Sequence, residues 1–104
     1  MKLVYPLMAN ILVAAVLASP ARASEDLAKK HQCLACHQID RKLVGPSYKD
    51  VAKKYKGQAD AEVRLAEKIR KGSTGVWGPV AMPANTKVSE SDAKTLAAWV
   101  LKLR

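Results

Sequence analysis

The sequence predicts an all-α protein made of three or four short helices. Apolar residues recur at intervals of three and four positions in several segments, and no segment alternates apolar and polar residues as a half-buried strand would. Serine, glycine and proline stand where such helices would begin and end. We justify each segment below in chain order.

The first 23 residues have the layout of a secretory signal peptide. They carry a lysine at position 2, continue with an apolar run over residues 3–18, and end with Ala21 and Ala23 in an A-x-A arrangement. The run contains one proline and one asparagine, and it is shorter than the ~20 residues that a membrane-spanning helix needs. We expect cleavage after Ala23, which leaves one domain over residues 24–104 and no membrane insertion afterwards.

The mature domain is expected to be small and basic. It has 81 residues and no phenylalanine, and its net charge falls from +9 to +7 once the leader is removed. A domain of this size buries only about 60% of the surface of its unfolded chain, so we expect a cofactor, a metal or a disulfide to supplement the core. In an exported protein the positive charge indicates acidic protein partners or a solvated lysine surface, rather than nucleic acid.

Two helices are predicted in the first half of the mature domain. Ser24 is the expected N-cap of the first helix, because two acidic residues follow it in the first turn. Gly45-Pro46 then breaks the chain, and Ser47 is the expected N-cap of a second helix that Gly57 stops. The apolar stripe of the second helix is Tyr48, Val51, Ala52 and Tyr55.

Two further helices are predicted in the second half. One covers residues 60–71 and ends at Gly72, where a left-handed residue belongs. The last begins with "SESD", in which Ser89 and Asp92 form a capping box. The expected inner stripes are Ala61, Leu65, Ala66 and Ile69 in the first of these helices, and Ala93, Leu96, Ala97, Val100 and Leu101 in the second. Trp99 is expected to pack in the core.

An irregular tract over residues 72–87, "GSTGVWGPVAMPANTK", separates these two helices. Its glycines and prolines exclude a regular helix. A structureless loop of this length in so small a domain is usually functional.

The segment "CLACH" contains the only two cysteines, Cys33 and Cys36, followed directly by His37. A dithiol redox pair is one interpretation, but that motif normally lies beside a βαβ unit, and no strands are predicted. A zinc site needs about four ligands, and apart from these three side chains the mature domain offers only His31 as a further cysteine or histidine. C-x-x-C-H is also the attachment signature of c-type haem.

The haem interpretation accounts for each position of the motif. Two thiols three residues apart on a helical turn can each add to one vinyl group of the ring, and His37 then presents an imidazole to the iron. Attachment takes place outside the cytoplasm, in agreement with the predicted leader. We therefore favour one covalent haem c.

The second axial position decides the function. Met82 is the only methionine of the mature domain, and it lies between Pro79 and Pro83 in the irregular tract. A thioether ligand favours ferrous iron and raises the reduction potential. The alternatives are a methionine that only fills the core, or an open or exchangeable sixth site, as in a gas sensor or a peroxidase-like protein. His31 is too close to Cys33 in sequence to reach the opposite face of the ring.

Three segments resemble a known family: "CLACHQIDRKLVGPSYKDVAKKY", "GVWGPVAMPAN" and "SDAKTLAAWVLKLR". They are similar to the small bacterial class I cytochromes c of the c-551/c-552 (c8) type, in order and over essentially all of residues 24–104. The resemblance implies the class I cytochrome c fold, with the short helices wrapped around one haem. It also implies a monomeric periplasmic electron carrier, not an enzyme, with thioether bonds at Cys33 and Cys36 and with His37 and Met82 as axial ligands.

The resemblance also assigns residues around the ligands. It implies that Pro46 orients the histidine through a neighbouring carbonyl, that Trp77 donates its indole N–H to a haem propionate, and that Asn85 hydrogen-bonds the methionine sulfur. The family often has an arginine beside the propionate, whereas the matching residue here is Lys68, which lacks the planar fork of arginine. The implied partners are nitrite reductase, cytochrome c peroxidase, a terminal oxidase or a membrane cytochrome complex.

Overall fold

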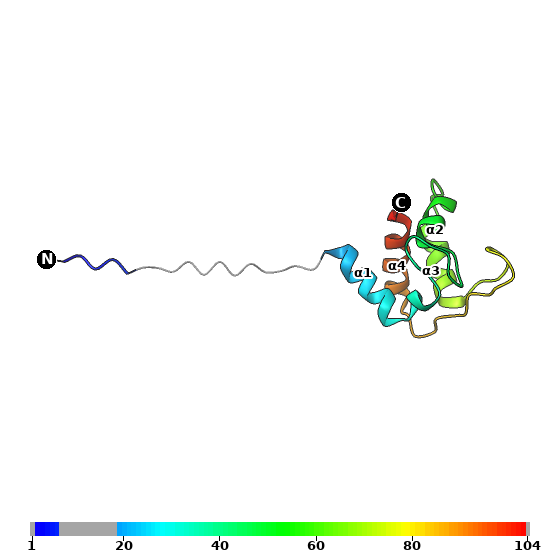
Figure 1. The fold of residues 1–104 in the computed structure, drawn as a ribbon, viewed down its shortest axis with the longest axis horizontal. Helices are drawn as coiled ribbons and strands as arrows, with labels where there is room; N and C mark the ends of the chain where they lie inside the picture. The colour runs from blue at the N-terminus through cyan, green and yellow to red at the C-terminus, as the bar shows by residue number, and fades with distance from the viewer. Residues whose placement is uncertain (1, 7–18, 104) are drawn as a thin grey trace.

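A computed structural model of the protein describes residues 2–6 and 19–103 (Figure 1). Its helices, in chain order, are α1 (Pro20–Lys30), the 3₁₀ turn η1 (Cys33–Ala35), α2 (Tyr48–Lys54), α3 (Ala61–Lys71) and α4 (Glu90–Lys102). Within the described residues the only β-type pairs are two isolated antiparallel bridges. The predicted all-α class is confirmed.

The first helix begins earlier than the sequence predicted, so the expected N-cap at Ser24 is wrong for the full-length chain. Ser19 is the N-cap and accepts a hydrogen bond from the Arg22 backbone N–H at 3.3 Å, and Pro20 occupies the first helical position. Ser24 is instead buried in the second turn. The helix therefore runs through the predicted cleavage site, while most of the predicted apolar run lies outside the described residues.

The predicted N-caps of α2 and α4 and the end of α3 at Gly72 are confirmed, whereas α2 ends at Lys54, before the predicted stop at Gly57, because the chain leaves the helix at the C-cap Tyr55. Ser47 accepts a hydrogen bond from the Asp50 backbone N–H at 3.1 Å, and Ser89 accepts one from the Asp92 backbone N–H at 3.0 Å. At the end of α3, Gly72 has the expected positive φ of +78°, although its ψ of 175° is extended and differs from that of the αL conformation.

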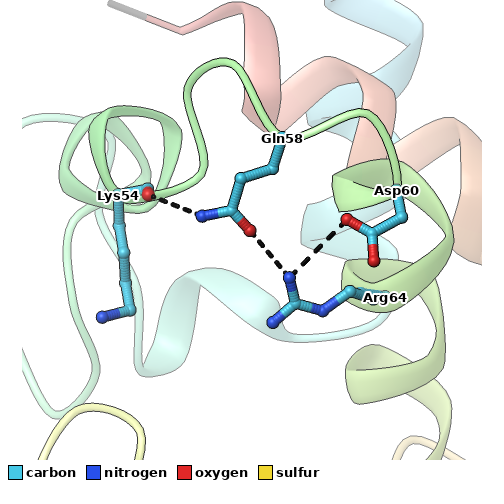
Figure 2. Close-up of polar contacts among 4 residues, drawn as sticks. All are labelled: Lys54, Gln58, Asp60 and Arg64. Carbon is cyan, nitrogen blue, oxygen red and sulfur yellow. Dashed lines mark hydrogen bonds and ion pairs between the residues drawn. The ribbon is translucent and has the colours of Figure 1, made fainter.

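The turn between α2 and α3 is fastened by side chains (Figure 2). The Gln58 amide donates to the Lys54 carbonyl at 3.3 Å and accepts from the Arg64 guanidinium at 2.7 Å. The same guanidinium lies 3.7 Å from the Asp60 carboxylate. Because these groups are exposed, we expect them to orient the two helices and to add little to stability.

Helix α4 is the centre of the packing and contacts α1, α2 and α3. Ala28, Ala93 and Ala97 are completely buried, so small side chains allow close approach of the helices. Trp99 is also buried and meets the Tyr48 ring edge-on at a centroid distance of 5.4 Å, which confirms its role in the core. The residues of the predicted stripes are buried, except Ile69 and Leu101, which are partly buried at the edge of the core.

Candidate functional site

A cavity of about 470 Å³ opens between the helices and the irregular tract. Its volume lies in the range of small-molecule and cofactor sites. Leu65 of α3 and Leu96 and Val100 of α4 contribute to its apolar lining. All eight residues singled out in the sequence also line it: Cys33, Cys36, His37, Pro46, Lys68, Trp77, Met82 and Asn85.

The cysteines approach the cavity from a tight turn. Gln32 has a left-handed φ of +60° and ends the run of α1, and the Cys36 and His37 backbone N–H groups both donate to the Cys33 carbonyl, at 3.2 and 3.0 Å. This winding brings both thiols and the imidazole to the same cavity. The two thiols do not form a disulfide with each other.

The thiol chemistry does not favour a redox dithiol. Burial raises the pKa of the Cys33 thiol, and a hydrogen bond with Tyr48 only partly opposes this effect. A dithiol oxidoreductase needs the opposite shift, because the thiolate is the nucleophile. In residues 2–6 and 19–103, no three His, Cys, Asp or Glu side chains form a group that could hold a metal ion.

The imidazole of His37 is held in one orientation. Its Nδ1 lies 2.7 Å from the carbonyl oxygen of Pro46. A carbonyl oxygen only accepts, so Nδ1 carries a proton, and in the singly protonated tautomer the lone pair of the ring is then on Nε2. Tyr48 stacks on the ring at a centroid distance of 5.1 Å and an interplanar angle of 20°. The ring is therefore both buried and prepared to bind a metal through Nε2.

Gly45 is a site residue that the sequence reasoning missed. A Cβ atom at this position would lie 2.6 Å from Cε1 of His37 and 3.0 Å from its Nδ1. The Gly45 backbone N–H also donates to the Cys36 carbonyl at 2.8 Å, which folds the loop back over the motif. The sequence analysis gives Gly45 no role beyond the break in the chain. Its proximity in sequence to the C-x-x-C-H motif was the signal that could have indicated this packing.

Met82 enters the cavity from the irregular tract, which is the yellow loop on the side of the bundle opposite α1 in Figure 1. Met82 and Ser73 form a two-bond antiparallel bridge, with N···O distances of 2.9 and 3.0 Å. Asn85 donates both its backbone N–H and its side-chain amide to the Ile69 carbonyl, at 3.1 and 3.0 Å. One of the two side-chain amide protons of Asn85 is thus used by α3, and the second is available to another acceptor.

The mouth of the cavity is basic and partly aromatic. Trp77 is 41% exposed, and the Lys54 ammonium lies 5.2 Å from the centre of its ring. Lys42 and Lys68 line the same cavity, and within the described residues neither takes part in an ion pair. An indole N–H and two ammonium groups therefore lie where acidic substituents of a bound group could reach them.

Together these groups fit a haem. A thiol pair and an imidazole with a free Nε2 lone pair lie in one part of the lining, a thioether comes from the irregular tract, and apolar helix residues contribute to the same cavity. This donor set suits an iron macrocycle attached through thioether bonds.

The comparisons with known proteins agree with this donor set. The family model described as cytochrome c matches residues 21–104. Cytochrome c-552 of Nitrosomonas europaea is 53% identical over 88% of this chain and 88% of its own length, and cytochrome c-551 of Pseudomonas aeruginosa is 52% identical over 93% and 94%. The crystal structure of Nitrosomonas europaea cytochrome c552 superposes with a TM-score of 0.76 and 55% identity, over 77% of this chain and 99% of that chain.

The fold is thus that of the class I cytochromes c, and the predicted resemblance is confirmed. These similarities also support a single covalent haem c as the cofactor, and electron transfer rather than enzymatic turnover as the activity. The chain belongs to the cytochrome c family of electron-transfer proteins.

Proposed function

We propose that this protein is a periplasmic carrier of single electrons, with haem c bound through Cys33 and Cys36 and ligated by His37 and Met82. The proposal depends on the observation that these four side chains line one cavity with apolar walls, although Met82 lies far along the chain from the other three. When bound, the haem supplies a reversible one-electron change between ferric and ferrous iron.

The surrounding residues keep the iron site rigid. The Pro46 carbonyl holds the proton on Nδ1 of His37, so Nε2 would be the atom that binds the iron, and the hydrogen bond would keep the ring from reorienting. Met82 would supply the second protein ligand, a soft donor that favours the ferrous state. The second amide proton of Asn85 is proposed to reach the methionine sulfur, and Trp77 and Lys68 to contact the haem propionates.

The basic mouth of the cavity supports docking of acidic redox partners. Lys42, Lys54 and Lys68 lie at or beside the cavity, in a chain with a formal net charge of +9. Such a surface accelerates encounter with a negatively charged protein, and the effect decreases as salt increases. The proposed partners are nitrite reductase, cytochrome c peroxidase, a terminal oxidase or a membrane cytochrome complex, each bound by a monomer.

Export and removal of residues 1–23 are part of the proposal. The match to the Nitrosomonas europaea structure covers 99% of that chain but only 77% of this one. A match of this extent is expected if residues 1–23 have no counterpart in the mature protein. No helix in the described ranges has the length and apolar character needed to cross a membrane.

The test is an absorption spectrum of the protein after periplasmic expression, in the oxidised and reduced states. A red protein with sharp reduced bands and the weak long-red band of a thioether on ferric iron is expected. Met82→Ala should remove that band, lower the reduction potential and allow rapid CO binding by the ferrous protein. Val63→Ala is the control, because Val63 of α3 is 61% exposed and does not line the cavity.

Two results would contradict the proposal. If the wild type lacks the long-red band and already binds CO rapidly, the sixth site is open, and a gas sensor or peroxidase-like protein becomes the better interpretation. A colourless protein with two titratable thiols would refute the attachment at Cys33 and Cys36. Mass spectrometry of the same sample tests cleavage after Ala23, because the mature chain must then begin at Ser24.

A further inference from the structure

We propose that Gly72 is a positioning residue for Met82, because only a residue without Cβ lets the methionine backbone come close enough to the end of α3. The inference rests on the proposed ligation of the iron by Met82. A Cβ atom on Gly72 would lie 2.6 Å from the Met82 carbonyl oxygen and 2.9 Å from the Ala84 backbone nitrogen. Both neighbours are backbone atoms, so no side-chain rotation can relieve the collision.

The close approach is needed for the pairing that follows Gly72 directly. The Ser73 N–H donates to the Met82 carbonyl at 3.0 Å, and the Met82 N–H donates to the Ser73 carbonyl at 2.9 Å. This bridge closes the loop of residues 74–81 and determines how far Met82 lies from α3. The same Met82 carbonyl oxygen that a Cβ atom would strike is the acceptor in this bridge.

The chain beyond Met82 cannot easily move to make room. Asn85 is fastened to the Ile69 carbonyl by two hydrogen bonds, and the Arg70 guanidinium donates to the Val88 carbonyl at 3.3 Å. On the other side, α3 is held by its extensive packing against α4. Displacement would therefore fall on the short segment around Met82, whose neighbours Ala81 and Pro83 are exposed.

A displaced Met82 backbone would weaken the bond between sulfur and iron. The sixth position would then be open in a larger fraction of molecules, and an added ligand would bind more tightly in proportion to that fraction. Gly72 would thus control whether the protein stays six-coordinate, although the residue contributes no ligand atom.

The experiment compares Gly72→Ala with Gly57→Ala in the ferric holoprotein. Gly57 is the control, because its φ is +79° against +78° for Gly72, a Cβ atom on Gly57 has no protein atom within 4 Å, and Gly57 does not line the cavity. Both variants place an alanine at a positive φ, and only Gly72→Ala introduces the collision with the Met82 backbone. We expect Gly72→Ala to weaken the long-red thioether band and to raise the affinity for added imidazole about tenfold, with Gly57→Ala close to the wild type.

The outcomes separate this inference from the proposed function. If the wild type itself lacks the thioether band, the ligation by Met82 fails and the inference fails with it. If the wild type has the band, then an unchanged Gly72→Ala, or an equal loss in both variants, overturns the role of Gly72 alone.

Hydrogen exchange tests the same idea if Gly72→Ala does not fold. In the wild-type holoprotein the Ser73 and Met82 amides should be protected and should exchange at similar rates, because they belong to one bridge. Rapid exchange of either amide, at the rate of an unstructured chain, would overturn the proposal.

Discussion

Replacing Gly45 by alanine tests whether close packing on His37 supports the site. Gly45 has no left-handed φ, so alanine introduces no backbone strain of that kind. The new Cβ atom would lie 2.6 Å from Cε1 of His37, about 0.8 Å short of the distance at which ordinary contact begins. Either the loop or the ring must move, and a moved ring loses the 2.7 Å hydrogen bond to the Pro46 carbonyl.

The expected cost follows from these two effects. Overpacking of a filled site costs about 1–3 kcal/mol, and loss of the hydrogen bond adds about 1 kcal/mol. Gly45→Ala should therefore reduce the free energy of unfolding by about 2–4 kcal/mol. For a domain of this size that corresponds to a decrease in Tm of about 10–30 °C.

Thermal unfolding of the ferric holoprotein, followed by far-ultraviolet circular dichroism, measures this cost. Gly57→Ala is the control, since Gly57 has φ +79° and no atom within 4 Å of a Cβ atom. That substitution should cost about 1–2 kcal/mol through backbone strain alone. If Gly57→Ala destabilises the protein as much as Gly45→Ala or more, the argument from packing against His37 is refuted.

Three further predictions concern the core, the surface charges and the irregular tract. Trp99→Ala should reduce the free energy of unfolding by about 3–5 kcal/mol, because Trp99 is buried in α4; guanidinium unfolding checks this, and a loss below about 1 kcal/mol would contradict it. The hydrogen bond and charge of Lys71 lower the pKa of Glu67, so this pair stabilises the protein above the ordinary glutamate pKa and the contribution is lost as pH falls through the lowered value. Lys71→Ala should return the Glu67 pKa to its ordinary range in an NMR titration, with only a small change in stability because both groups are exposed; an unchanged Glu67 pKa would show that Lys71 is not the cause. Asn85→Ala should cost about 1 kcal/mol through the lost bond to the Ile69 carbonyl and should increase imidazole affinity, whereas unchanged unfolding would show that this bond contributes nothing.

Local patterns along the chain predicted most of the secondary structure. Ser47, Ser89 and Gly72 mark helix ends because capping depends on residues within one turn, which the sequence displays directly. The prediction failed at Ser24, where the start of α1 depends on Ser19 and Pro20 in the segment assigned to the leader. Ser19 and Ser24 can both serve as an N-cap. Which of them starts the helix depends on whether residues 19–23 are still attached or have been removed with the leader.

The chemical types of the site were also readable from the sequence, since "CLACH" and a single methionine between prolines restrict the possible cofactors. Only the tertiary structure decided how these groups are held. The stacking of Tyr48 on His37 and the bridge between Ser73 and Met82 join residues that no single helical turn brings together. The same holds for the contacts of Gly45 with His37 and of Gly72 with Met82. Both contacts depend on the space that glycine leaves where another residue has a Cβ atom. A sequence shows that a residue is glycine, but the atom that would occupy the place of its Cβ is known only when the chain has folded.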